Sequence, residues 1–564
     1  MPSHTAPELA RVVVDLQVLW TLLCAALVLL MQAGFCCLEA GAVRHKNSVN
    51  VAAKNVVDLC ISFPAFFVVG YALMFGEDRF GLFGHPSFFL SELDAADLTA
   101  FVYQAAFCST AATIVSGGVA ERCRFLPYML MSAVTAAVIY PLFGHSVWGG
   151  GVLSQLGFHD FAGASVVHMV GAGITLAGVQ VMGARRDRFD AEGGAQPIPA
   201  SSMPMVAVGV IILTFGWIGF NGGSAPLGDQ TAEIIANTLL AACFGGLGAL
   251  LITWAYRGLA SVEPIFNGVL AGLVSITACA DVVSLQAASL VGIAGGMAMV
   301  LATAALERLR LDDAVGAIPV HGAGGLVGIL LTAGFAKSEY LAEAGIDRLE
   351  LLRAQGVGAL ACLLWSYSVG YLAWALVARV TTLRVGPVEE SVGMNFSEHQ
   401  VDNEAHALTR SLLETGNGRL PTQATIDAIG GDQFAALANS IHELARERDN
   451  NDQQAVRWSN DLDAISGTLD LNQRIGRETI ESYHDEVLNV DRTLEQISTL
   501  LEGDGVDSQA LTIASDSITN LRRRVDLLRH KLPSGIDSWE QINRMTERLD
   551  LLAGTIRGDV RETS

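Results

Sequence analysis

The sequence predicts an all-α polytopic membrane protein that continues into a soluble α-helical, coiled-coil domain. The 564 residues are 51% hydrophobic and 16% charged, with a mean hydropathy of +0.41, whereas soluble globular proteins carry about 25% charged residues. Charged residues make up about 11% of residues 1–386 but about 28% of residues 387–564, so the two parts suit different solvents. This composition excludes disordered, collagen-like and disulfide-stapled secreted proteins. The net charge of −22 argues against a nucleic-acid partner.

Eleven apolar runs, separated by charged or Gly/Pro-rich breaks, have the length of transmembrane helices. They lie at 12–41, 49–76, 99–120, 127–146, 163–183, 203–222, 232–256, 264–280, 285–306, 319–336 and 356–382. The first run is too long for a secretory signal peptide, and it lacks a basic leader and a small-residue cleavage site.

Lys and Arg are unevenly shared between the two sides of this predicted bundle. With the N-terminus outside, the inner loops and span ends hold twelve of them and the outer ones five. Because basic residues accumulate on the cytoplasmic side, we expect a multi-pass protein of the cell (inner) membrane. Its N-terminus lies outside, and its acidic C-terminal part lies in the cytoplasm.

The chain divides into three predicted segments. They are a membrane domain at 1–386, a cytoplasmic C-terminal tail element at 387–404, and a cytoplasmic helical domain with a signalling or regulatory role at 405–564. The change in charged fraction after residue 386 places the first boundary.

Heptad patterns predict helices in the C-terminal domain. Apolar residues repeat at coiled-coil spacing over 480–501, 511–532 and 542–556, with Gly and Pro between the runs. Stop signals between such runs favour either antiparallel helical hairpins or a three-helix bundle. No ATP-lid glycine pattern and no metal-ligand cluster accompanies them, so we expect no enzyme, no metal and no cofactor.

Two histidines lie inside predicted spans. His168 in the fifth span and His321 in the tenth both occur in the pattern Val-His-x-x-Gly. Spans 5 and 10 are equivalent if the domain consists of a 5+5 inverted repeat, as in several transporter folds. The pair is either two separate core histidines or the polar centre of a narrow pore. A facing pair can hold a small molecule that donates and accepts hydrogen bonds, and can relay a proton.

Aromatic residues on other spans give a second signal. Phe107 lies in span 3, Trp148 just after span 4 and Phe220 in span 6, with Ser224 close behind. They are either ordinary core and interfacial aromatics or a cage that attracts a cation to its π faces, with the serine oxygen as an acceptor.

Ordered motifs over residues 15–400 resemble the ammonium transporter (Amt/Mep/Rh) family. The motifs are Gln32-Ala33-Gly34-Phe35, Leu38-Glu39-Ala40-Gly41 with Val43-Arg44 and Lys46-Asn47, Asp160-Phe161-Ala162-Gly163 with Val167-His168, Gly216-Trp217 with Gly219-Phe220-Asn221, Asn267-Gly268 with Ala271-Gly272-Leu273-Val274, and Asp312-Asp313 with Val320-His321-Gly322.

The resemblance implies functional roles for eight residues. They are a recruitment site for ammonium at Phe107, Trp148 and Ser224 with Tyr103 beside it, a gate at Phe107 and Phe220, a twin-histidine pore centre at His168 and His321, and the acid Asp160 at the start of span 5. Asp160 either caps that span or supports the cation.

The resemblance also implies a function and partners. It implies a homotrimer that recruits ammonium outside, deprotonates it at the gate and reprotonates it inside, with the cytoplasmic face docking a PII-type signal protein. A sensor with little transport, signalling through the helical tail, is the alternative, and a gas channel like the Rh branch is a third. Gly316, Ala314 and Gln400 depart from the family's usual residues, which puts the inner vestibule and PII docking in question.

Overall fold

The computed structural model describes residues 6–85, 89, 95–401, 480–501, 508–531 and 537–562. The chain separates into two compact units, Met1–Ala195 with Pro199–Val401 and Gln196–Ile198 with Asp402–Ser564. Residues 402–479, part of which belong to the predicted helical domain, lie outside the described residues.

The first half of the first unit contains the first five spans. Its elements are α1 (Ala6–Ala42), α2 (His45–Ala65), η1 (Phe66–Gly70), α3 (Tyr71–Phe75), β1 (Glu77–Arg79), β2 (Phe83–His85), α4 (Ala95–Gly118), α5 (Phe125–Val134), η3 (Thr135–Ile139), α6 (Tyr140–Trp148), α7 (Val152–Gln155), η4 (Ala164–Met169) and α8 (Val170–Met182). The two short strands form an antiparallel hairpin.

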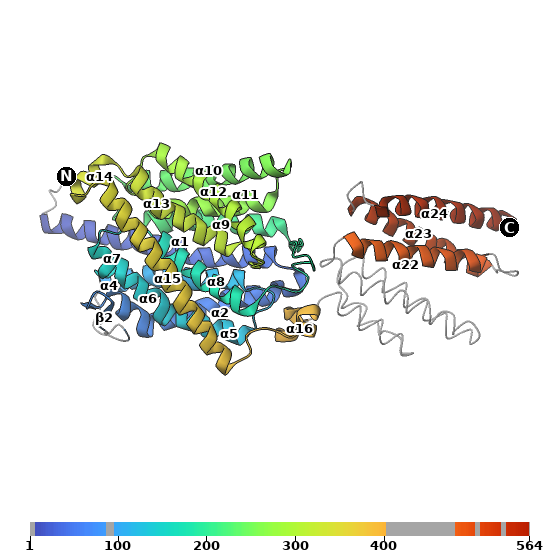
Figure 1. Cartoon of the computed structure of the whole chain (residues 1–564), viewed down its shortest axis with the longest axis horizontal. Helices are drawn as coiled ribbons and strands as arrows, with labels where there is room; N and C mark the ends of the chain where they lie inside the picture. Colours follow the sequence, from blue (N-terminus) through green and yellow to red (C-terminus); the bar gives the residue numbers. More distant parts are fainter. Residues whose placement is uncertain are drawn as a thin grey trace. The chain divides into compact units, whose positions relative to one another are not determined.

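The second half contains the remaining spans and the tail. Its elements are α9 (Met203–Gly222), α10 (Thr231–Arg257), α11 (Val262–Thr277), α12 (Leu285–Arg308), η5 (Ile318–Ala323), α13 (Gly324–Phe335), α14 (Ser338–Ala344), α15 (Arg348–Val380), α16 (Pro387–Val392) and α17 (Met394–His399). Helix α15 runs obliquely across one face of the unit (Figure 1).

The predicted membrane spans are confirmed as helices. Within the described residues, ten helices are long and apolar enough to cross a membrane, and Val262–Thr277 is a shorter apolar helix at the position of the predicted eighth span. Large apolar side chains point outward, such as Leu19, Leu251 and Leu360, each more than half exposed. Outward apolar surface on this scale suits lipid rather than water.

Several spans are wider than an α-helix at one turn. The π-helical turns η4 and η5 open spans 5 and 10, and they carry His168 and His321 respectively. The two turns therefore occupy equivalent positions in spans 5 and 10, as the predicted 5+5 inverted repeat requires. Such turns are frequent at functional sites, so they direct attention to the two histidines.

The second unit contains α22 (Ile480–Leu501), α23 (Ser508–Lys531) and α24 (Asp537–Glu562). Each pair of these helices is in contact, and Val490, Leu494, Ile518, Val525 and Leu549 are among the residues of their shared core. Of the two arrangements that the sequence left open, the described helices adopt the one with three helices around a common core.

Candidate functional site

Two phenylalanine rings stack at the centre of the aromatic group. The Phe107 ring on α4 and the Phe220 ring on α9 lie 3.9 Å apart between centroids, at 6° between planes, and both side chains are buried. Tyr103, one turn away on α4, lies 4.6 Å from Phe107, and Trp148 lies 6.3 Å from Phe107. The structure therefore brings together the four aromatics that the sequence singled out here.

The hydroxyl of Ser224 lies at the edge of this group. Its Oγ donates to the Phe220 carbonyl over 2.9 Å, and it lies 3.2 Å from the Tyr103 hydroxyl oxygen. Tyr103 itself donates to the same carbonyl over 2.6 Å. The single hydroxyl proton of Ser224 is used in its hydrogen bond to the Phe220 carbonyl. The lone pairs of its oxygen can accept hydrogen bonds from a ligand with several donors.

Asp160 holds the start of span 5. Its carboxylate accepts from the backbone N–H groups of Gly163, Ala164, Ser165 and Val166 over 2.8 to 3.1 Å. Burial raises the pKa of this carboxyl, and these hydrogen bonds act in the opposite direction. The backbone carbonyl of Asp160 also accepts from the Trp148 indole N–H over 2.8 Å. The geometry is that of a helix cap which also orients Trp148.

The two histidines lie against each other. The Nδ1 atoms of His168 and His321 are 3.1 Å apart, and the rings are nearly parallel at 13° with centroids 5.1 Å apart. Only one proton fits between the two nitrogens, so one ring donates and the other accepts. Nε2 of His168 is buried and has no partner among the described residues, which leaves it free for a ligand.

The rings form a continuous stack, which we call the pore column: Tyr103, Phe107, Phe220, His168 and His321. Phe220 lies 5.4 Å from His168 between centroids, so the two stacked phenylalanine rings lie directly against the histidine pair. Trp217 stacks on His168 at 5.2 Å, and its indole N–H donates to Thr277 Oγ1 over 2.8 Å. Sequence reasoning included Trp217 in a motif but missed this contact, because its partner is far away in the chain.

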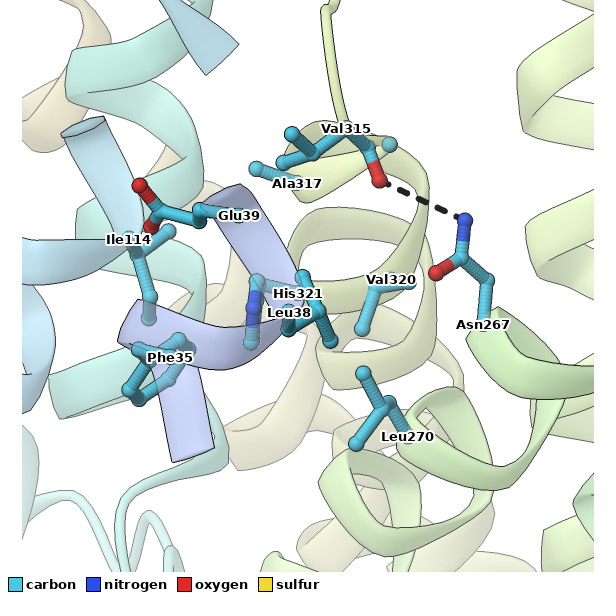
Figure 2. A pocket seen from close by; sticks show the side chains of 11 residues that line it. Phe35, Leu38, Glu39, Ile114, Asn267, Leu270, Val315, Ala317, Val320 and His321 are labelled. Carbon is cyan, nitrogen blue, oxygen red and sulfur yellow. Dashed lines mark hydrogen bonds between the residues drawn. The ribbon is translucent and has the colours of Figure 1, made fainter. Parts of the chain in front are cut away.

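A small, partly open cavity lies next to His321, with about 20 Å³ available to the centre of a water-sized molecule (Figure 2). It is lined mainly by apolar side chains, including Phe35, whose ring is 6.4 Å from His321. Two polar side chains, Glu39 and Asn267, join His321 in the lining. Phe35 and Glu39 both lie in motifs quoted above, but their sequence context predicts no role for them.

Buried ion pairs form a second polar group, the tail-side ionic layer: Arg44, Glu121, Arg122, Arg185 and Asp312. Arg44 and Arg185 donate to Glu121 Oε2 over 2.7 and 2.8 Å. Arg185 also donates to both Asp312 oxygens over 2.8 Å. Burial alone would raise the pKa of Glu121 and Asp312, but the neighbouring guanidinium groups hold both well below their usual range.

The tail helices α16 and α17 are hydrogen-bonded to the start of α2. Lys46 Nζ donates to the carbonyls of Glu390 and Ser391 over 2.8 and 2.6 Å. Asn395 Oδ1 accepts from the Asn50 N–H over 3.0 Å, and its Nδ2 donates to the His45 carbonyl over 3.0 Å. We call this end of the bundle the tail side.

Two of the departures from the family pattern have left-handed backbones. Gly316 has φ +82° and Gln400 has φ +57°. A Cβ at Gly316 would lie 2.7 Å from Asn267 Nδ2, so any residue with a side chain would be strained and crowded at this position. Gln400 ends α17, where glycine is the usual residue. Among the described residues, no group of three or more His, Cys, Asp or Glu side chains could hold a metal ion.

The family model described as "Ammonium Transporter Family" matches residues 19–404. The chain belongs to the ammonium transporter family. Ammonium transporter Amt2 of Archaeoglobus fulgidus is 38% identical over 420 residues, covering 70% of this chain and 89% of that protein. The candidate ammonium transporter sll0537 of Synechocystis sp. is 36% identical over 512 residues, covering 86% of this chain and 94% of that protein.

Solved structures of the family superpose on the chain. One titled "Sensor Amt Protein" has a TM-score of 0.68 and 38% identity, and covers 69% of this chain and 100% of that chain. Mep2 of Candida albicans has a TM-score of 0.62 and 27% identity, and covers 66% of this chain and 87% of that chain. The chain is therefore a multi-pass membrane protein of a transporter family whose substrate is ammonium or ammonia, and not an enzyme.

Proposed function

We propose that the protein recruits ammonium on the side opposite the tail, deprotonates it and conducts it through the histidine pair. The observation that carries the proposal is the 3.1 Å contact between His168 and His321 beside the stacked Phe107 and Phe220 rings. A buried polar pair behind an aromatic barrier is suited to a small hydrogen-bonding molecule and not to a hydrated ion.

Recruitment uses the aromatic faces and one oxygen. A cation held near Trp148 and Phe107 is attracted to their π faces, while Ser224 accepts one of its N–H groups. Tyr103 positions Ser224, because both hydroxyls contact the Phe220 carbonyl. Asp160 supports this site through its carbonyl contact with Trp148.

Deprotonation provides the selectivity. A bare cation loses most of its hydration when it enters a narrow apolar pore, which costs far more than the transfer of neutral ammonia. Potassium is close to ammonium in size but has no proton to give up. A pore that admits only the deprotonated form therefore rejects potassium.

The histidine pair accommodates ammonia and provides a path for the proton. One neutral imidazole donates and the other accepts, so the pair can hold a molecule that does both. The unpartnered Nε2 of His168 gives the substrate a nitrogen to bind. Ammonia regains a proton in the cavity next to His321.

The proposal extends to topology and assembly. We propose that the N-terminus lies outside, that the tail and the helical unit lie in the cytoplasm, and that three chains form a homotrimer with one pore each. A PII-type signal protein or another cytoplasmic signalling partner would dock on the tail side.

Ammonium sensing with little transport is the second candidate function. Two observations favour it: the match to the structure titled "Sensor Amt Protein", and the helical unit that follows the family match. In this case ammonium occupancy of the same pore would change the state of the helical unit.

The test is ammonium-evoked current in proteoliposomes. The full chain is compared with a truncation after Glu404, at matched protein density. A saturable current with ammonium and none with potassium supports transport, and a change on truncation shows that the helical unit regulates the pore. Ammonium binding without current in either form rejects transport and leaves the sensor.

A further inference from the structure

Glu39 is an ionisable side chain inside a membrane span that the mechanism above does not use. It lies in the last turn of α1 and is 2% exposed. It lines the cavity next to His321, and Figure 2 shows its carboxylate beside Ile114. Ionisable groups at such positions are costly and are associated with substrate or ion pathways.

Only one of the two oxygens of the Glu39 carboxylate accepts a hydrogen bond of defined length from a described residue. Oε2 accepts from Asn55 Nδ2 over 3.0 Å. In the part of the chain that the structure describes, no hydrogen bond to Oε1 is found. A Cβ at Gly117 would come within 3.3 Å of Oε1, so the absence of a side chain there keeps this oxygen uncrowded.

Two neighbours of Glu39 also have unused polar atoms. Asn55 Nδ2 donates both to Glu39 and to the Val51 carbonyl over 3.0 Å, which leaves its buried Oδ1 without a partner. The buried hydroxyl of Ser116 lies within hydrogen-bonding reach of Glu39 and has no other partner in the described structure. The acceptors around Glu39 are thus a carboxylate oxygen beside this hydroxyl and the amide oxygen of Asn55.

These atoms call for a ligand rich in donors. Acceptors that lack a partner away from water are unfavourable, and a carboxylate adds a preference for positive charge. The Nζ of the neighbouring Lys54 donates to the Cys123 carbonyl over 2.5 Å, and no hydrogen bond from it to Glu39 is found among the described residues. Because Glu39 lines the cavity, a small cation with several N–H groups bound there would supply a donor to its carboxylate.

We propose that Glu39, with Asn55 and Ser116, forms an ammonium-binding site at the tail-side mouth of the pore. This inference rests on the proposed transport function. The site holds ammonium that has re-formed beyond His321 before it leaves, and it binds ammonium that enters from the tail side. It is separate from the recruitment site around Phe107, which lies on the other side of the histidine pair.

The test compares Glu39→Gln with the wild-type full chain, with ammonium applied from each side of the membrane in turn. Glutamine keeps the size and the Asn55 contact but removes the charge. We expect the half-saturating ammonium concentration from the tail side to rise about tenfold or more, the equivalent of one charge-assisted hydrogen bond. From the opposite side it should stay within about twofold, since the recruitment site is unchanged.

Two further variants control the comparison. Glu307→Gln removes a carboxylate that pairs with Arg188 outside the cavity, and it should leave both concentrations unchanged. Glu39→Asp keeps the charge and should retain a larger part of the tail-side affinity than Glu39→Gln. Equal losses in Glu39→Gln and Glu39→Asp, or an equal change from both sides, would overturn the inference in favour of a packing role.

A second readout does not depend on transport. Ammonium chloride added to the wild-type chain should change a carboxylate band in its infrared difference spectrum, and this change should be lost in Glu39→Gln but kept in Glu307→Gln. A spectrum unaltered by Glu39→Gln rejects the site even where the current is normal. If the wild-type chain shows this band change but no current, transport is rejected and the proposed binding site is retained.

Discussion

The pore column and the tail-side ionic layer are both buried in the same unit, yet they have opposite chemistry. In the column, Phe107 and Phe220 precede two histidines, and His168 Nε2 has no partner among the described residues. In the layer, each carboxylate has guanidinium partners: Glu121 pairs with Arg44 and Arg185. Buried charge is stable where the chain supplies its partner. The unpartnered atom of the column belongs to an imidazole ring that has no charged partner, and that nitrogen is available to a ligand.

The largest effect on stability is expected when a carboxylate of the tail-side ionic layer is removed. Glu121→Gln leaves the buried guanidinium groups of Arg44 and Arg185 without their shared carboxylate. We expect a loss of about 3–5 kcal/mol in the free energy of unfolding, because an unpaired buried charge is costly. Chemical denaturation in detergent measures it. Glu77→Gln, which breaks the exposed pair with Arg79, should change stability by less than about 1 kcal/mol.

The layer should also set the response to acid. Because the pKa values of Glu121 and Asp312 are lowered in the folded state, their stabilisation is complete above the unfolded pKa of about 4 and is lost as the pH falls through the folded values. We expect the stability difference between wild type and Glu121→Gln to shrink below about pH 4. Thermal unfolding from pH 7 to pH 3 measures it, and a constant difference would contradict the assignment.

The column should respond in selectivity rather than in stability. His168→Asp places a fixed negative charge beside the gate, so a cation no longer has to lose its proton to enter. We expect a potassium current to appear at about tenfold or more above the wild-type background, since 1.4 kcal/mol of cation stabilisation corresponds to a factor of ten. His321→Glu tests the second ring. A potassium current that stays at zero in both variants would contradict exclusion by deprotonation.

The smallest effect is expected in the tail. Asn395→Ala removes two hydrogen bonds to the start of α2, each worth about 1 kcal/mol. Amide hydrogen exchange in Met394–His399 should speed up about tenfold, while the global unfolding midpoint is unchanged. A matching fall in global stability would show that the tail belongs to the core of the unit.

The sequence predicted those features that depend on local pattern. Hydropathy and length placed the eleven spans, since a helix in lipid needs a continuous apolar run. His168 and His321 were recognisable because ionisable residues are rare at that depth. The three heptad helices followed from their spacing.

Contacts between distant residues could not be predicted in this way. Glu121 meets Arg185 and Arg185 meets Asp312 across 64 and 127 residues, and no periodicity links them. Trp217 and Glu39 lay in quoted motifs, but their contacts with His168 and with Asn55 depend on how the spans pack. The π-helical turns were also missed, because their sequences have no cue that separates them from α-helix.

Those π-helical turns have a consequence for chain length. Each turn at His168 and His321 accommodates a residue that an α-helix would not. Deleting one residue from either turn would let it close into an ordinary α-helical turn, so the helix after the turn would keep nearly the same face while the side chains inside the turn would be re-aimed. The imidazoles would then face different neighbours while every amino acid around them stayed the same. The alignment of the two rings therefore depends on residue count as much as on residue identity.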